Sequence, residues 1–456
     1  MNRASLLTQD SLVESSTTQQ KLKWSLVDIT IYLHFFIPSY ILFKQPFEFY
    51  ITYTFIILYL PFLVTKYPIP RGIWWILLIL LVTGLFNVWA ENNTYKNFFK
   101  IYLNIAVNLI FYAAVVAYYN YDVETMFRRY LKGAVIVCIY GLIQVIAYKI
   151  GALALVDLRN FGFNKWAIMP GGLLGIRINS TYPEPAYFAN FIAPAAFVAI
   201  YSLFIKKTNL MKRWEAIIIL LVYFLSFSTV GYTAIFVSMF LLLLNFGLIR
   251  YALLAIPVGV FVFYVLYNNV EDFKDRIDGV KIVFIDEYLL EEKDKEVANQ
   301  QAFLARQWRV LTKVHGSPLV LYNNYYVAMQ NFRSNPLFGT GLGSHEIAFQ
   351  KYNLNYLISK WYLFNTPDAN SMGLRIISEL GLLGIIFMVL FIKNNFIHKN
   401  QTTNDNVWII SSALLVLIII QILRQGNYTY AGFIFFAYLY YQNKLNLNLS
   451  VNSTNE

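Results

Sequence analysis

The sequence predicts an all-α polytopic integral membrane protein with about twelve transmembrane helices and one large extracytoplasmic loop that contains short amphipathic helices. Composition is the first observation: 58% of the 456 residues are hydrophobic and only 13% are charged, which is more apolar surface than a soluble core of this size needs. The second observation is a series of apolar runs of about 17 to 25 residues, the length that crosses a hydrocarbon core. The third is the distribution of lysine and arginine between these runs.

The apolar runs divide the chain into five parts. Residues 1–25 are polar and lack the features of a signal peptide, so we expect a disordered cytoplasmic tail there. Helices 1 to 9 and an outer loop at 151–184 are expected within 26–268, the large loop at 269–371, helices 10 to 12 within 372–441, and a second cytoplasmic tail at 442–456. The expected spans are 26–43, 49–65, 72–90, 101–119, 131–150, 185–205, 214–229, 231–249, 251–268, 372–392, 406–423 and 428–441. Because two runs almost touch near 228–231 and the last run is short, the count stays open between eleven and thirteen.

Lysine and arginine predict the orientation of these spans, because short cytoplasmic loops carry an excess of both. With the N-terminus inside, the inner connections carry Lys21, Lys23, Lys66, Arg71, Arg128, Arg129, Lys132, Lys206, Lys207, Lys212, Arg213, Arg250, Lys393, Lys399 and Lys444. The short outer connections carry fewer: Lys44, Lys96, Lys100, Arg159, Lys165, Arg177 and Arg424. Both termini are therefore expected in the cytoplasm.

Several function classes are disfavoured. The net charge of +11 is spread over short clusters and forms no continuous basic face, so no nucleic-acid partner is expected. The single cysteine, Cys138, excludes an intrachain disulfide. The four histidines lack metal-ligand spacing, and neither a D-x-D nor a P-loop motif occurs. We therefore expect no metal site and no cofactor.

The large loop has two unlike halves. Its first part, "EDFKDRIDGVKIVFIDEYLLEEKDKE", mixes charges densely and is typical of a solvated surface. Its second part places cations among aromatic residues, and an apolar stripe at helical spacing predicts an amphipathic helix on the membrane surface. The stripe consists of Leu319, Tyr322, Tyr326, Met329 and Phe332. This helix should end before Asn335, because Pro336 pushes the preceding residue out of the α region.

The stretch "RINSTYPEPAYFANF" (177–191) sets polar residues at the start of an apolar run. Pro185 suits the first turn of a helix, and the macrodipole favours a carboxylate such as Glu184 at that end. Glu184 can therefore be a helix-start anion and Arg177 a headgroup anchor. Alternatively, the two form a functional pair, because Arg177 lies on the side where lysine and arginine are disfavoured.

Three segments resemble motifs of Wzy-type polysaccharide polymerases in the O-antigen ligase/polymerase superfamily. "RINSTYPEPAYFANF" resembles R-x-x-[SG]-x-x-x-E-P-S-x-[FY]-[AG], "NPLFGTGLGS" (335–344) resembles N-P-L-[FL]-G-x-G-x-G, and "DANSMGLRIISELGLLGIIF" (368–387) is similar to H-N-x-x-L-x-x-x-x-E-x-G-[LI]-x-G. They occur in the expected order, and the resemblance covers residues from about 70 to 440. It implies a GT-C-like glycosyltransferase architecture.

Two departures from these motifs bear on the chemistry. Ala369 stands where the ligases of the superfamily carry a histidine base, and alanine has no proton to exchange. Glu184 and Pro185 resemble the polymerases, whereas ligases usually carry N-P-N there. Both departures disfavour a ligase that transfers finished glycan. A flippase or transporter, a rival of another class, predicts an internal repeat, and the two halves show no convincing similarity.

The resemblance implies transfer of a growing glycan from an undecaprenyl pyrophosphate carrier to the acceptor sugar of an incoming lipid-linked unit. This would occur on the outer face of the bacterial inner (cytoplasmic) membrane, with a chain-length regulator as a further candidate partner. Arginine binds pyrophosphate bidentately, and the acceptor hydroxyl needs a base. The candidate catalytic residues are Glu184 and Arg177, with Asp368 as the second choice of base.

The candidate substrate-binding residues are Arg306, Arg309, Arg333, His345, Asn370, Tyr182 and Tyr187. Which arginine of the large loop binds pyrophosphate stays open. The tyrosines, together with Trp166, are candidates for stacking on pyranose rings. Glu379 stands four residues after Arg375 on an expected helix, so these two are expected to neutralise each other within the membrane.

Overall fold

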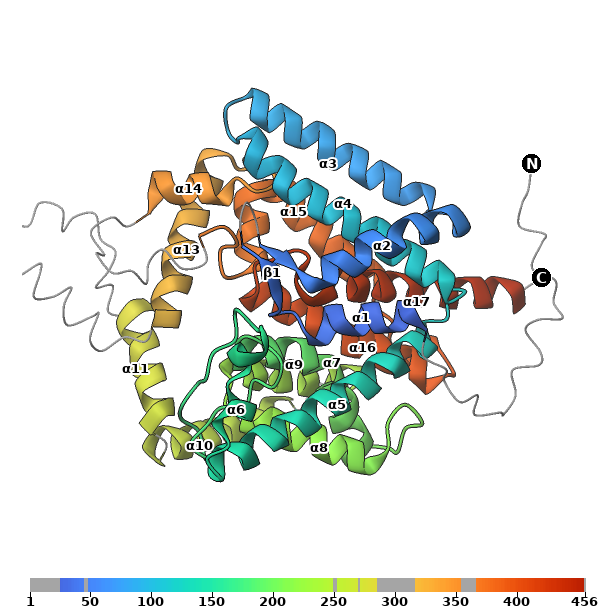
Figure 1. Ribbon diagram of the computed structural model, residues 1–456. Helices are drawn as coiled ribbons and strands as arrows, with labels where there is room; N and C mark the ends of the chain where they lie inside the picture. Colours follow the sequence, from blue (N-terminus) through green and yellow to red (C-terminus); the bar gives the residue numbers. More distant parts are fainter. Residues whose placement is uncertain are drawn as a thin grey trace, which may run out of the picture.

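The protein is mostly helical in the computed structural model, which describes residues 25–44, 48–248, 252–269, 271–284, 316–353 and 366–454 (Figure 1). Arg306 and Arg309, the polar segment 1–24 and residues 285–296 of the charged first part of the large loop lie outside the described residues. The first ten helices are α1 (Leu26–Phe36), α2 (Ile51–Lys66), α3 (Arg71–Trp89), α4 (Tyr95–Tyr118), α5 (Val123–Lys149), α6 (Leu153–Val156), α7 (Pro185–Phe204), α8 (Arg213–Leu225), α9 (Thr229–Asn245) and α10 (Ala252–Asn269). They are followed by α11 (Glu271–Phe284), α13 (Gly316–Ser334), α14 (His345–Tyr352), α15 (Met372–Asn395), α16 (Asp405–Arg424) and α17 (Phe433–Thr454).

Six of the described helices are long and apolar enough to cross a membrane: α3, α4, α5, α7, α15 and α16. α1, α2 and α9 are apolar but shorter. Large apolar side chains such as Trp74, Trp75 and Phe86 are exposed along α3, and Phe387 is exposed on α15. Exposed apolar surface on this scale fits a lipid-facing helix and not a water-facing one. The chain is therefore a helical membrane-embedded protein.

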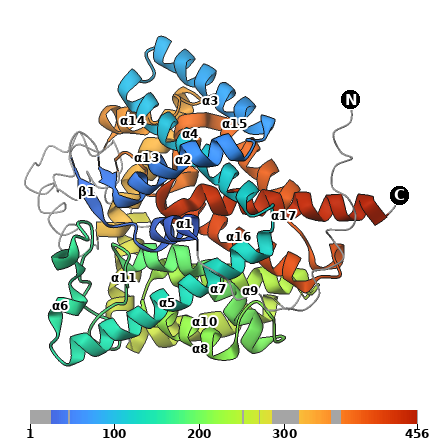
Figure 2. The same ribbon diagram turned by 45° about the vertical axis from the view of Figure 1, so that its right-hand side comes forward.

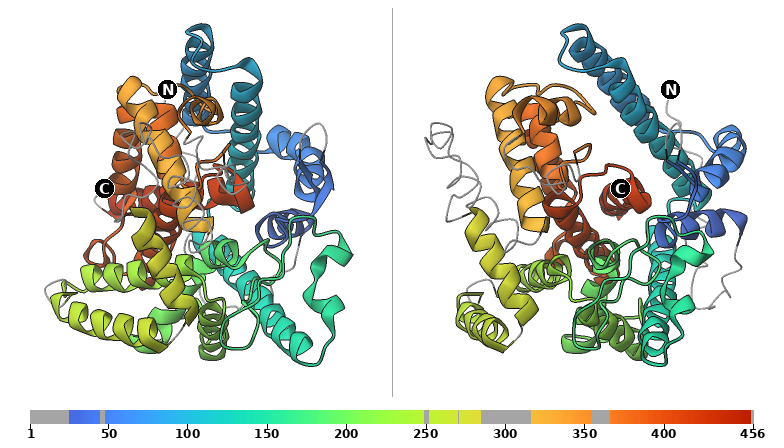
Figure 3. Two further views of the ribbon diagram at one scale, coloured as in Figure 1. Left: turned by 90° about the vertical axis from the view of Figure 1, so that its left-hand side faces the viewer. Right: turned by 60° about the vertical axis from the view of Figure 1, so that its left-hand side comes forward.

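α7 and α16 form the centre of the bundle. Most residues of both helices are buried, and α7 packs against α8, α9 and α16. Ala189, Ala193 and Ala196 on α7 leave room for close approach of the neighbouring backbones, which is how membrane helices usually pack. α3 and α4 lie together at one edge of the molecule, and α8 and α10 lie at the opposite edge (Figures 1 and 3).

Two segments differ from the expected spans. The expected span at 26–43 is wrong as one helix: α1 ends at Phe36, ahead of Pro38, which disfavours helical geometry in the residue before it. The chain then forms a two-stranded antiparallel hairpin of β1 (Ile41–Phe43) and β2 (Phe49–Tyr50). At the other end of the chain, α17 extends to Thr454 and projects beyond the other helices (Figure 2). The expected tail at 442–456 is thus helical over most of its length.

Candidate active site

The segment 177–184 is an irregular loop that buried hydrogen bonds hold against α5 and α7. Gln144 of α5 binds both backbone groups of Ser180, donating to its carbonyl at 3.1 Å and accepting from its N–H at 2.8 Å. The Trp166 indole donates to the same carbonyl at 2.8 Å. Asn179 donates to the carbonyls of Ala167 and Tyr182 at 3.0 and 2.9 Å. Because these hydrogen bonds pair the polar backbone groups of the loop, the irregular backbone can lie inside a membrane bundle.

Glu184 stands at the N-terminus of α7, where Pro185 begins the helix as the sequence predicts. The Glu184 carbonyl accepts from the N–H groups of Tyr187 and Phe188 at 3.1 and 3.2 Å. Its carboxylate makes no capping hydrogen bond, and the residue is exposed. The carboxylate is therefore not consumed by helix capping and remains accessible for chemistry.

Glu184 and Arg177 lie within electrostatic range of each other. Although Glu184 is partly open to solvent, the protein atoms crowded around its carboxylate partly desolvate it and raise its pKa, and the positive charge of half-buried Arg177 opposes that rise. A carboxyl group with a raised pKa is a better proton acceptor than an ordinary one. The loop therefore brings a carboxylate with a raised pKa and a guanidinium together at the start of α7.

Asp368 belongs to a turn that leads into α15. Its Oδ1 accepts from the Asn370 N–H at 3.0 Å, and both Ala369 and Asn370 have left-handed backbone, with φ of 57° and 54°. Ala369 is fully buried. Asp368 interacts electrostatically with Tyr187 and with Arg375. The second candidate base and the first residues of α7 therefore lie in one neighbourhood.

Arg375 and Glu379 form the expected buried ion pair on α15. Arg375 Nε donates to Glu379 Oε1 at 2.8 Å, and Nη1 donates to the Gly426 carbonyl at 3.0 Å. The guanidinium lies over the Tyr428 ring, 4.2 Å from its centroid, while the Tyr428 hydroxyl donates to Glu379 Oε2 at 3.0 Å. The prediction that these charges neutralise each other is confirmed.

The segment 336–341 and α15 are joined through a break in the helix. Gly381 has φ 61° and ψ −150°, outside the helical region. The groups that the break frees bind the other segment: the N–H groups of Leu382 and Leu383 donate to the Pro336 and Leu337 carbonyls at 2.8 and 3.1 Å. The Glu379 carbonyl accepts from the Gly341 N–H at 2.7 Å. Two of the three motif segments named above are therefore one structural unit.

Three further predicted residues have surroundings that bear on their roles. His345 is fully buried, with Nε2 3.0 Å from the Asn324 Oδ1 and Nδ1 3.1 Å from the Ser378 Oγ; burial lowers the pKa of His345 to about 3. Tyr182 is buried between Phe188 and Phe191. Substrate contact with either residue would require this packing to open. Arg333 is exposed in the last turn of α13.

Sequence reasoning missed two neighbours of Tyr187, which lies in the first turn of α7. Tyr430, which falls inside an expected span, lies in a short 3₁₀ helix (Tyr430–Gly432), and its ring centroid is 4.8 Å from that of Tyr187. Glu48, in the hairpin, interacts electrostatically with Tyr187. No local pattern marks either residue, because both reach the site through contacts between segments far apart in the chain.

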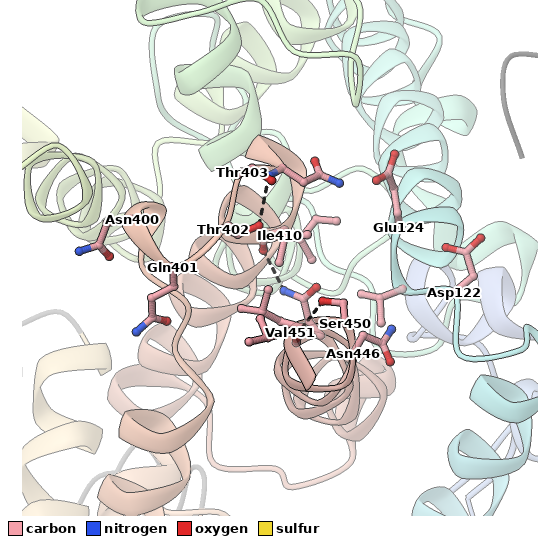
Figure 4. A pocket seen from close by; sticks show the side chains of 15 residues that line it. Asp122, Glu124, Asn400, Gln401, Thr402, Thr403, Ile410, Asn446, Ser450 and Val451 are labelled. Carbon is pink, nitrogen blue, oxygen red and sulfur yellow. Dashed lines mark hydrogen bonds between the residues drawn. The ribbon is translucent and has the colours of Figure 1, made fainter. Parts of the chain in front are cut away.

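A pocket of about 620 Å³ lies elsewhere, between the start of α5, the α15–α16 connection and α17 (Figure 4). Polar side chains from these three segments, including Asp122, Asn404 and Asn446, line it. Asp122 precedes Gln144 by about 33 Å of helix rise along α5, so the pocket is remote from the loop 177–184. Within the described ranges, no group of three metal-binding side chains occurs.

The fold defines the class of protein as a helical integral membrane protein with polar side chains gathered at one end of its central helix α7. No protein-family model matches the chain, and no curated protein matches it.

Proposed function

We propose that the protein polymerises lipid-linked oligosaccharide repeat units on the outer face of the bacterial inner membrane. The observation that carries the proposal is the loop 177–184, which is fixed by buried hydrogen bonds and presents an exposed carboxylate with a raised pKa beside an arginine. The order of the three motif segments and the pairing of two of them through backbone hydrogen bonds also support it.

The proposed reaction is a glycosyl transfer between two lipid-linked substrates. A hydroxyl oxygen of the acceptor sugar attacks the anomeric carbon of the growing glycan, and the bond from that carbon to the pyrophosphate oxygen breaks. Glu184 accepts the hydroxyl proton. Undecaprenyl pyrophosphate leaves with the electron pair, and the planar guanidinium of Arg177 binds its developing charge bidentately. Asp368 is the alternative base.

The proposed topology has twelve spans. The six long helices are joined by α1, α2, α8, α9, α10 and α17, and both termini are cytoplasmic. This arrangement places the N-terminus of α7 on the outer side, and segment 336–341 enters the bundle from that side to reach α15. Short helices such as α1 are compatible with it, because irregular backbone is tolerated at membrane depth where protein covers it. A chain-length regulator is a proposed partner.

The lipid-linked glycans of cells that lack the gene test the proposal. Loss of a polymerase should leave single repeat units on the carrier. Chains of normal length that stay on the carrier would instead indicate a ligase, and an unchanged profile would contradict glycan transfer altogether. A plasmid-borne copy should restore the polymer ladder, and the Glu184→Gln copy should not.

A further inference from the structure

Three tyrosines from separate parts of the chain gather near the start of α7. Tyr187 lies in the first turn of α7, Tyr430 in the 3₁₀ helix before α17, and Tyr50 at the end of β2. The Tyr187 and Tyr430 rings are inclined at 56°. The Tyr50 hydroxyl donates to Glu48 Oε2 at 2.9 Å, and Tyr50 interacts electrostatically with Tyr187. We call Tyr50, Tyr187 and Tyr430 the tyrosine cluster.

The hairpin that carries Tyr50 is tied to the loop before α7. The Ser39 hydroxyl donates to the Thr181 carbonyl at 3.2 Å, and the Asn164 amide donates to the Ile41 carbonyl at 2.5 Å. Lys165 pairs with Glu48 at 2.5 Å. These contacts fix the distance between the hairpin and the start of α7, so the tyrosine cluster is preorganised.

Carboxylates dominate the electrostatic surroundings of the cluster. The charged neighbours that act most strongly on the Tyr187 hydroxyl are Asp368, Glu184 and Glu48. A cation beside the cluster, Lys165, is paired with Glu48 and lies over the Tyr50 ring, 5.7 Å from its centroid. A group bound against this hydroxyl therefore meets acceptors of hydrogen bonds. Hydroxyl and ammonium groups suit such a place, whereas a further carboxylate would be repelled.

One hydroxyl of the cluster lacks a partner. The Tyr430 hydroxyl is buried and has no hydrogen bond to any part of the chain that the structure describes. A buried hydroxyl without a partner costs free energy, and a bound ligand or water would remove that cost. This observation points to a ligand independently of the carboxylates.

We propose that the tyrosine cluster and Glu48 bind the acceptor sugar next to Glu184, and that the site takes neutral, hydroxyl-rich or amino sugars and rejects sugars that carry a carboxylate. A pyranose offers C–H faces for the aromatic rings and hydroxyl donors for the carboxylates. The inference rests on the proposed function only in calling the bound sugar the acceptor. What it states concerns binding and not turnover.

Equilibrium binding of unreactive sugars tests the proposal without turnover. The full-length protein in nanodiscs is titrated with cellobiose, N-acetylglucosamine and cellobiouronic acid, and binding is followed by saturation-transfer NMR. At least one neutral sugar should bind. Cellobiouronic acid should bind about tenfold more weakly than cellobiose, because the carboxylates of the site repel its carboxylate; a tenfold difference corresponds to about 1.4 kcal/mol. Absence of binding by both neutral sugars, or equal binding of the acid and cellobiose, would overturn the proposal.

Variants locate the binding. Tyr187→Ala and Tyr430→Phe should weaken binding of the neutral sugar, the second without loss of a ring. Glu48→Gln should weaken neutral-sugar binding, because it removes a charged acceptor of hydrogen bonds, and should strengthen binding of cellobiouronic acid, because Lys165 then loses its partner. Tyr95→Ala removes an exposed tyrosine at the start of α4 and is the matched control. Normal binding by Tyr187→Ala and Tyr430→Phe would refute the sugar site while leaving the polymerase proposal intact. If polymer ladders survive Glu184→Gln, only the assignment of Glu184 as the base is wrong, and the sugar site is unaffected.

Discussion

Replacing Glu184 by glutamine separates the proposed catalytic role from a structural one. The carboxylate makes no capping hydrogen bond, so its contribution to folding acts through the helix dipole and is about 0.3–1 kcal/mol. A loss of this size changes the ratio of folded to unfolded protein by no more than about fivefold. Loss of a general base typically costs on the order of 10²- to 10⁴-fold in rate. The two explanations therefore predict effects of different size.

The assay combines polymer ladders, membrane levels of the protein and turnover of purified protein with lipid-linked units. Glu184→Gln should reach normal membrane levels and retain lipid-substrate binding while turnover is lost. Arg177→Lys should fail nearly as badly as Arg177→Ala, because a point charge cannot reproduce bidentate contact. Near-normal ladders from Glu184→Gln would refute the role of Glu184 and transfer it to Asp368.

The pH profile provides a second readout of the same residue. Partial desolvation of the carboxylate raises the pKa of Glu184, so activity should fall, as pH is lowered, at a higher pH than an ordinary carboxylate would give. The free energy of unfolding should change in the opposite sense. Between the pKa of Glu184 in the unfolded state and its higher pKa in the folded state, the folded protein binds more protons. The contribution of Glu184 to stability therefore declines as pH rises through this range. Arg177→Ala removes the opposing charge and should move the residual activity profile to higher pH. An unshifted profile would contradict the electrostatic link between the two residues.

Three further predictions concern topology, metal and the break in α15. Cysteines at Gln350 and Asn209 should be labelled from outside and from the cytoplasm respectively, and labelling of both from one side would refute the proposed orientation. Transfer by purified protein should survive EDTA; complete loss that Mg²⁺ or Mn²⁺ restores would reveal a metal site. Gly339→Ala should destabilise the protein by at least about 1 kcal/mol, measured by thermal unfolding in detergent, because Gly339 has φ 63° and an added Cβ would lie 2.4 Å from the Glu379 carbonyl carbon. Gly72→Ala, where an added Cβ meets nothing within 4 Å, is the control, and an equal loss there would contradict the argument.

Local sequence signals predicted the features that depend on neighbours in the chain. Pro185 marked the start of α7, and the spacing of Arg375 and Glu379 gave their ion pair, because both follow from helix geometry alone. The hairpin after α1 was not predicted, because its apolar strands have the composition of a membrane span. Even Pro38, which ends the helix, is compatible with a kinked span.

The candidate site was predictable only in part, for a related reason. The arginine and carboxylate of segment 177–184 are close in sequence, so their proximity could be inferred from the loop between them. Tyr430 and Glu48 reach the same place from opposite ends of the chain, and only the packed bundle brings them together. The burial of His345 likewise depends on Asn324 and Ser378, which belong to two other helices.

The break at Gly381 has a consequence for biogenesis. Segment 336–341, whose carbonyl and N–H groups bind the broken turn of α15, precedes that helix in the chain. With the proposed orientation, it has already crossed the bilayer when the translocon releases α15. The freed backbone groups can thus find their partners at the moment of insertion, and the nascent helix need not expose them to lipid. The order of synthesis itself protects the weakest point of the helix.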